Sequence, residues 1–421
     1  MKRAIVLSGG GSKGAYQIGV WKALKKLNIT YDIVTGTSVG ALNAALMVQK
    51  EYMKALWLWF NMDFNRIFDD KIDADYETKE GKSKIFHTYV QAILDGGMQI
   101  QRLEHTVEKA LNVKKIYKSR IDLGIVTVKI PSLKPMQLQK KDIPKEQLKD
   151  YLIASASCFP AFQKKKIGDS TYIDGGLYDN LPINLAVEMG ATEVIAVDLE
   201  EIGFKKKVKN KDIPIVTIAP NNKIGSFLVF DKHMARRCIR FGYNDTMKVY
   251  QKLDGKYFTF KKGHLKKNYD VYFSAYLKRL RSYLSPKTSK NVILDNVLKI
   301  TVLKHFLVTP DSKITIKDWN IEIEKLGKTF QMEETKIYDI HKWNQQILAY
   351  YQTIEQDKTI EKNIKENKFK KLFSSASMIR YLCELMKNAK TDTKKLYGLA
   401  LLFPHEFLQA VYIQTISGDR I

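Results

Sequence analysis

The sequence lacks any long apolar run. A helix that crosses a bilayer needs about 20 consecutive apolar residues, and the longest candidate, residues 396–403, is shorter and is followed by Pro404, His405 and Glu406. The apolar stretch at residues 4–7 is followed at once by three glycines, so it does not predict a signal peptide. We therefore expect a cytoplasmic protein.

Cysteine is also scarce. The chain has 3 cysteines, and they lie far apart: Cys158, Cys238 and Cys383. Their spacing does not match that of metal ligands, which favours buried free thiols without a functional role.

Acidic residues are outnumbered by basic ones. Lys and Arg total 70 against 45 Asp and Glu, which gives a net charge of +25. The excess is spread evenly along the chain, and no zinc-finger spacing or RNA-binding aromatic motif accompanies it. This pattern favours a lysine-rich solvated surface and argues against nucleic acid as a partner. The densest basic cluster, residues 205–211, predicts a solvated loop, with contact to an anionic membrane surface as the alternative.

A length of 421 residues favours two domains. Short β-branched runs alternate with helical patterns in the first 200 residues or so, which predicts an α/β fold: a mainly parallel sheet in a three-layer α/β/α core. Beyond about residue 245 the apolar spacing becomes helical. We expect a catalytic domain at residues 1–245 and a mainly α-helical accessory region at residues 246–421. The elements that support this are strands at residues 4–7, 29–35, 121–130, 191–199 and 213–219 and helical patterns at residues 14–27, 39–47, 293–303 and 378–385.

Residues 36–40 have the sequence GTSVG and lie between an expected strand and an expected helix. Flanking glycines allow the sharp turn of a nucleophile elbow, which would expose the hydroxyl of Ser38. The following helix would direct its positive end toward a developing oxyanion. The pentapeptide alone is equally compatible with an ordinary turn of small residues.

Residues 9–14, with the sequence GGGSKG, form a second glycine-rich strand-to-helix turn. Its backbone N–H groups can converge on an oxyanion. A dinucleotide-binding loop would place an acidic residue at the end of the second strand, but Asp32 lies near that strand's start. A P-loop would continue with Lys and then Ser or Thr after the last glycine, where this chain has Ala15 and Tyr16. The oxyanion hole is the interpretation that remains.

A nucleophilic serine needs a base. None of the 7 histidines lies in a context that suggests a loop over the sheet. Asp174 does lie in such a context, because it ends an expected strand and is followed by Gly175 and Gly176. A plain Asp-Gly turn is the alternative. Asp179 lies in the same loop, but the double glycine favours Asp174 as the base.

These motifs, in this order, resemble those of the patatin-like phospholipases. Residues 154–162 and 179–182 add to the resemblance, which covers roughly residues 4–220. The family usually has Arg where this chain has Lys13.

The resemblance implies a lipid acyl hydrolase with a Ser–Asp dyad, an acyl-enzyme intermediate and no metal or cofactor. The substrate would be a phospholipid or another glycerolipid, and the protein would contact the membrane peripherally. The oligomeric state stays open, and a non-catalytic lipid-binding or scaffold protein is the alternative. The implied site comprises the nucleophile Ser38, the base Asp174, the oxyanion-hole residues Gly9, Gly10 and Gly11, the elbow glycines Gly36 and Gly40, the supporting Gly14, Gly175 and Gly176, and Lys13 as a candidate for orienting substrate.

Overall fold

The computed structural model describes residues 2–68, 78–201, 203–284, 316–357, 359–360, 373–387 and 393–418. The chain divides into two compact units, Met1–Val249 and Tyr250–Ile421. Each unit is described by itself below.

Unit 1 is built on an eight-stranded sheet with the order β5-β6-β3-β2-β1-β7-β8, in which β4 pairs with β3 outside this path. The five strands from β3 to β8 in this order run parallel, whereas β4 and β6 are antiparallel to β3. The mainly parallel sheet expected from the sequence is confirmed. The strands are β1 (Arg3–Leu7), β2 (Ile33–Thr37), β3 (Asp122–Ile130), β4 (Lys134–Gln139), β5 (Lys165–Ile167), β6 (Ser170–Asp174), β7 (Glu193–Val197) and β8 (Ile215–Ile218).

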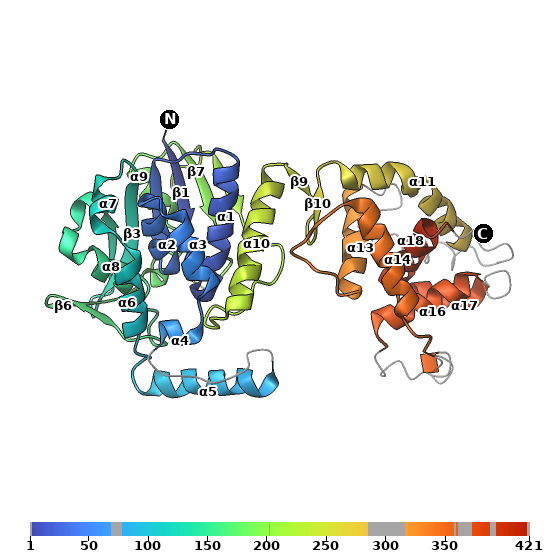
Figure 1. Ribbon diagram of the computed structural model, residues 1–421, viewed down its shortest axis with the longest axis horizontal. Helices are drawn as coiled ribbons and strands as arrows, with labels where there is room; N and C mark the ends of the chain where they lie inside the picture. Colours follow the sequence, from blue (N-terminus) through green and yellow to red (C-terminus); the bar gives the residue numbers. More distant parts are fainter. Residues whose placement is uncertain are drawn as a thin grey trace. The chain divides into compact units, whose positions relative to one another are not determined.

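Helices cover both faces of this sheet (Figure 1). On one face, α9 packs Ile183 and Ala186 against Ala4 and Val6 of β1. On the other, α2 packs against β1, β2 and β3. Burial from both sides explains why residues 4–7 are apolar without alternation. The helices of unit 1 are α1 (Ala15–Lys26), α2 (Val39–Val48), α3 (Tyr52–Phe60), α4 (Phe64–Ile67), α5 (Lys79–Leu94), α6 (Gln101–Ala110), α7 (Val113–Lys118), α8 (Leu148–Ser155), α9 (Ile183–Glu188) and α10 (Lys232–Val249), with short 3-10 turns at Gly11–Gly14, Lys140–Asp142, Lys145–Gln147 and Gly175–Leu177.

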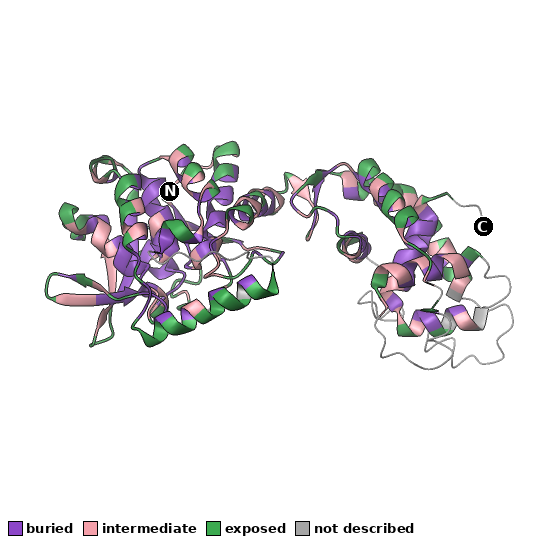
Figure 2. Ribbon diagram, turned by 60° about the horizontal axis from the view of Figure 1, so that its bottom comes forward, coloured by how far each residue is buried: buried purple, intermediate pink, exposed green. Residues whose placement is uncertain are grey.

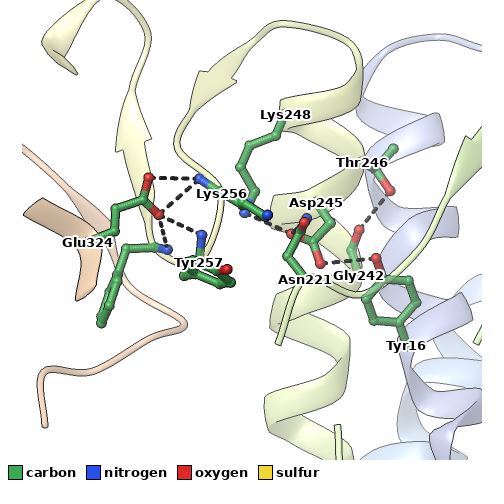
Figure 3. Close-up of polar contacts among 10 residues, drawn as sticks. Tyr16, Asn221, Gly242, Asp245, Thr246, Lys248, Lys256, Tyr257 and Glu324 are labelled. Atoms are coloured by element: carbon green, nitrogen blue, oxygen red, sulfur yellow. Dashed lines mark hydrogen bonds and ion pairs between the residues drawn. The ribbon is translucent and has the colours of Figure 1, made fainter. Parts of the chain in front are cut away.

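Helix α10 is tied to α1 at close range. A Cβ atom on Gly19 would lie 2.0 Å from the carbonyl oxygen of Ile239, and one on Gly242 would lie 2.0 Å from that of Tyr16. The Tyr16 hydroxyl donates a 3.0 Å hydrogen bond to Asp245, which also forms an ion pair with Lys248 (Figure 3). Unit 1 therefore extends through α10.

Unit 2 is mainly helical, as expected. Its elements are α11 (His264–Leu284), α13 (Ile316–Thr329), α14 (Ile340–Thr353), α16 (Ser375–Lys387), α17 (Thr393–Leu402) and α18 (Pro404–Ile416), together with a three-stranded sheet of β9 (Leu253–Asp254), β10 (Thr259–Lys261) and β11 (Ile337–Tyr338). Trp319 and Trp343 are among the largest fully buried side chains of its core. The helical pattern expected at residues 293–303 lies outside the described residues.

One buried carboxylate stabilises a turn in unit 2. Glu324 accepts hydrogen bonds from the backbone N–H groups of Lys256, Tyr257 and Phe258 (Figure 3). A carboxylate that would be costly to bury alone is thereby satisfied by backbone donors.

Within the described part of the chain, no helix combines the length and the apolar character that spanning a bilayer requires.

Candidate active site

The turn that carries Ser38 joins β2 to α2 and is sharply strained. Ser38 has φ 57° and ψ −129°, a conformation that costs a residue with a side chain free energy. A Cβ atom on Gly36 would lie 2.3 Å from the carbonyl oxygen of Gly40, and one on Gly40 would lie 2.4 Å from that of Leu7. Only glycine fits at both positions, and the serine between them faces a cavity that it helps to line.

A second serine holds this turn in place. The backbone N–H of Ser38 donates a 2.9 Å hydrogen bond to Oγ of Ser155, whose hydroxyl donates to the carbonyl oxygen of Val126 at 2.7 Å. Ser155 ends α8, and Val126 belongs to β3. Sequence reasoning assigned Ser155 no role, although it falls within residues 154–162, one of the segments that carried the family resemblance.

Asp174 reaches the same place from β6. The register pairs Thr37 with Val126 and Asp174 with Thr127, so β2 and β6 leave the sheet at the same level on either side of β3. Asp174 is 7% exposed. Burial raises the pKa of its carboxyl group to about 6, although hydrogen bonds from the Ser38 side chain and the Gly176 backbone N–H act in the opposite direction.

The glycines that follow Asp174 have separate functions. A Cβ atom on Gly175 would lie 2.2 Å from the carbonyl oxygen of Val126, so the chain can pass β3 only without a side chain there. The N–H of Gly176 donates to Oδ1 of Asp174 at 2.7 Å. This bond orients the carboxylate.

Asp179 is a second buried carboxylate in this loop, and burial raises its pKa to about 6 as well. Its Oδ1 accepts the backbone N–H groups of Leu181 and Lys206, each at 3.3 Å. These bonds give Asp179 a structural role, because they join the loop after β6 to the loop after β7. Asp174 is the carboxylate that lines the same cavity as Ser38.

The glycine-rich loop after β1 lies beside Ser38. A Cβ atom on Gly9 would come within 3.1 Å of Cβ of Ser38, but the Gly9 N–H already donates to the carbonyl oxygen of Asn180 at 3.1 Å. Gly10 and Gly11 line the cavity together with Ser38 and Asp174. Gly11 has φ 52°, and a Cβ atom there would lie 2.1 Å from the carbonyl oxygen of Phe227. The geometry therefore narrows the candidate oxyanion donors to the N–H groups of Gly10 and Gly11.

Gly14 ends this loop and packs directly on the serine turn. A Cβ atom there would lie 2.6 Å from Cγ2 of Val39, the residue after Ser38. The loop after β1 and the turn after β2 are thus fixed relative to each other.

Three polar side chains near the site differ in their freedom to bind a substrate. Lys13 forms an ion pair with Glu201, and burial lowers the pKa of its ammonium group. Asn43 donates to Gln17 at 2.8 Å and accepts from Trp59 at 3.0 Å. Asn180 lines the cavity, and its buried Nδ2 has no hydrogen-bond partner among the described residues. Asn180 is therefore better placed than Lys13 to donate to a bound molecule.

Two cavities, which we call the two hollows, share Ser38 as a lining residue. The larger cavity, of about 430 Å³, contains Asp174 and is bordered by Leu177, Phe204 and Phe227. The smaller one, of about 80 Å³, has walls that are almost entirely apolar: Val39, Leu42, Leu46, Leu58, Trp59, Met62, Ile67, Leu103, Val107, Ala110, Leu111, Ala156, Phe162 and Phe230. Ser38, Gly11 and Phe162 line both. A serine that lines both a wide cavity and an apolar pocket suits the binding of an ester that carries a hydrocarbon chain.

The comparisons agree with this geometry. Residues 5–187 match the family model described as Patatin-like phospholipase. Patatin-like phospholipase domain-containing protein 7 of Mus musculus is 28% identical over 205 residues, which is 47% of this chain and 13% of that protein. Lysophospholipase NTE1 of Debaryomyces hansenii is 25% identical over 210 residues, which is 47% of this chain and 12% of that protein. The chain thus spans only a small part of the length of these relatives.

A solved structure is similar over more of the chain but less closely. VipD from Legionella pneumophila aligns with 99% of this chain and 91% of that chain at 12% identity, with a TM-score of 0.36, which is too low to support a further argument.

Proposed function

We propose that the protein, whose residues 5–187 match the patatin-like phospholipase family model, is a serine hydrolase that removes acyl chains from lipid esters, an activity of the phospholipase A or lysophospholipase type. The observation that carries the proposal is that Ser38, in its strained turn, and the buried Asp174 line the same cavity. Lipid degradation would be its metabolic role.

In the proposed reaction, Asp174 accepts the hydroxyl proton as Oγ of Ser38 attacks the ester carbonyl. A carboxylate with a pKa of about 6 is a better base near neutral pH than an ordinary aspartate. The tetrahedral oxyanion would accept hydrogen bonds from the N–H groups of Gly10 and Gly11. Collapse of this intermediate expels the alcohol and leaves an acyl-enzyme on Ser38, which water then hydrolyses.

The two hollows suggest how an ester would lie. The apolar pocket beside Trp59 and Phe230 suits the acyl chain, because burying hydrocarbon there is favourable. The wider cavity suits the polar part of the lipid, with Nδ2 of Asn180 available as a donor. The similarity to a protein named lysophospholipase favours esters with a single acyl chain among the substrates to be tested first.

A non-catalytic lipid-binding protein on the same fold is the weaker alternative. Such a protein has no use for a serine held at φ 57° beside a carboxylate of raised pKa. Backbone strain of this kind persists where the surrounding structure maintains it for a function.

The test is a panel of phospholipids, lysophospholipids, monoacylglycerols and short-chain esters offered to the purified protein, with released fatty acid as the readout. We expect release from at least one lipid class and none with Ser38→Ala. Full turnover by Ser38→Ala, or no release from any ester by the wild type, contradicts the proposal.

A further inference from the structure

Helix α5, Lys79–Leu94, is apolar on two faces. Ile85, Tyr89 and Ala92 are buried, with exposed fractions of 3%, 6% and 8%. A second set of apolar side chains, spaced at i, i+4, i+7 and i+8, points outward. This outer stripe comprises Phe86 (65% exposed), Val90 (39%), Ile93 (41%) and Leu94 (75%).

The outer stripe is an unusual surface for a helix. A surface helix of a water-soluble domain normally places polar residues opposite its buried face, and a contiguous exposed apolar patch marks a site of interaction. Figure 2 shows α5 at the front of unit 1 with much of its length exposed. Lys79, two turns before Phe86, is also exposed and lies on the same side by helical spacing.

The inner face of α5 packs on the walls of the catalytic cavity. The Tyr89 hydroxyl donates a 2.6 Å hydrogen bond to the carbonyl oxygen of Leu228, which lines that cavity. The Tyr89 ring contacts Phe68, whose ring lies 5.3 Å from that of Phe162. Phe162 lines both hollows. Figure 1 shows α5 running across unit 1 at the end of the sheet opposite the N-terminus, where the carboxyl ends of β1 and β2 carry the site.

The border of the cavity also carries exposed apolar side chains. Leu177 and Phe204 both line the cavity and are 49% and 67% exposed. Phe204 is followed directly by exposed lysines at positions 205–207, which fall in the basic cluster noted in the sequence. Lys206 lies over the ring of Tyr178 with Nζ 4.2 Å from its centroid. Exposed apolar side chains next to lysines are typical of surfaces that bind anionic lipid interfaces.

We propose that the outer stripe of α5 docks on the surface of an anionic phospholipid membrane, and that this contact brings the catalytic cavity to its lipid substrate. The inference rests on the proposed function for the identity of the substrate. The apolar stripe would enter the interfacial region, and the lysines near the cavity would lie against lipid headgroups. An acyl chain could then pass from the membrane past Phe204 to Ser38 without crossing bulk water.

The test measures binding apart from turnover. In a Ser38→Ala background, flotation is measured with vesicles of equimolar phosphatidylcholine and phosphatidylglycerol and with vesicles of phosphatidylcholine alone. The variant is Phe86→Gln/Ile93→Gln/Leu94→Gln. The matched control, Met53→Gln/Val271→Gln/Leu402→Gln, removes three other exposed apolar side chains, which are 70%, 57% and 54% exposed, from α3, α11 and α17.

We expect the parent and the control to bind the anionic vesicles, with binding that weakens as salt is added, and the α5 variant to lose about tenfold or more of its partitioning. Equal binding by the α5 variant, or no binding by the parent, overturns the inference. A change in oligomeric state on size exclusion, with vesicle binding unaltered, also overturns it and assigns the stripe to a second copy of the chain. Unchanged thermal unfolding of the variant shows that the result is not due to misfolding.

A second readout separates this inference from the proposed function. With Ser38 intact, the α5 variant should hydrolyse a short-chain ester in solution at the parental rate. If no ester is cleaved by any form while flotation still depends on α5, the proposed activity fails and the docking surface stands.

Discussion

Ser38 and Asp174 lie on opposite sides of β3 and line the same cavity. Thr37 pairs with Val126 on one side of that strand, and Asp174 pairs with Thr127 on the other. Ser38 follows Thr37 directly, so the register alone brings the two residues to the same level. Because β6 runs antiparallel to β3, its carboxyl end comes back along β3 to the level at which β2 ends.

Asp174, at the end of β6, and Asp179, in the loop that follows, should differ in function. We expect Asp174→Asn to lower kcat by about three orders of magnitude or more, because the amide cannot accept the serine proton. Asp179→Asn is the matched control, since it removes the other buried carboxylate of raised pKa. It should weaken the contacts with Leu181 and Lys206 and retain most of the turnover per folded molecule. Steady-state kinetics with a soluble ester measure kcat of both variants. A larger loss of kcat in Asp179→Asn than in Asp174→Asn would identify Asp179 as the base.

The pH dependence of the reaction should reflect Asp174. The base must be ionised to accept a proton, and burial raises its pKa to about 6. Activity should therefore be full above this value, fall to half near pH 6, and decrease about tenfold for each further pH unit below it. A profile of kcat/KM on an uncharged soluble ester reports this limb without titration of the substrate. Constant activity down to pH 4 would exclude Asp174 as the base.

Gly11 should tolerate no side chain. Gly11→Ala places a methyl group 2.1 Å from the carbonyl oxygen of Phe227 and at a positive φ of 52°. The loop must then move, and we expect kcat to fall by about 100-fold or more as the oxyanion donors lose their positions. Gly398→Ala is the control, because nothing lies within 4 Å of its added Cβ. It should leave kcat unchanged and raise the stability of α17 by about 0.5–1 kcal/mol.

Ser155 should act as a positioning residue. Ser155→Ala removes the acceptor of the Ser38 N–H and the donor to Val126. We expect the free energy of unfolding to fall by about 1–3 kcal/mol, and kcat to fall while KM changes little, because the strained turn loses its support.

Ser157→Ala provides the comparison for Ser155, since that hydroxyl donates only to Ile153 within the preceding turn of the chain. Its effect should be on stability alone, as measured by denaturant unfolding alongside kinetics. Equal kcat values for the two variants would show that Ser155 does not position the site.

Much of the fold was determined by local sequence. The strands expected at residues 4–7, 121–130, 191–199 and 213–219 correspond to β1, β3, β7 and β8. The first three are buried along most of their length, and a strand buried on both faces must be continuously apolar. β8 is a partly exposed edge strand. The second strand begins later than expected, at Ile33, and runs to Thr37. Residues 29–32 do not pair in the sheet as part of this strand. The Asp32 side chain instead accepts a hydrogen bond from the backbone N–H of Arg3. The strands β4 and β5 were not predicted, since they are largely polar and only partly buried.

The sequence by itself determined where backbones would approach closely: glycines flank Ser38, precede it in the loop after β1 and follow Asp174, and several of these positions leave no room for a side chain. Tertiary structure decided the rest, because the partners lie far apart in the chain. It paired the Gly9 N–H with the carbonyl oxygen of Asn180 and the Lys13 ammonium with Glu201, and it brought the Ser155 hydroxyl to the backbone N–H of Ser38. It also turned the outer stripe of α5 outward, because Tyr89 on the inner face of that helix packs against Phe64 and Phe68. Spacing along a helix shows that two faces are apolar, but only the packed structure shows which of them is covered.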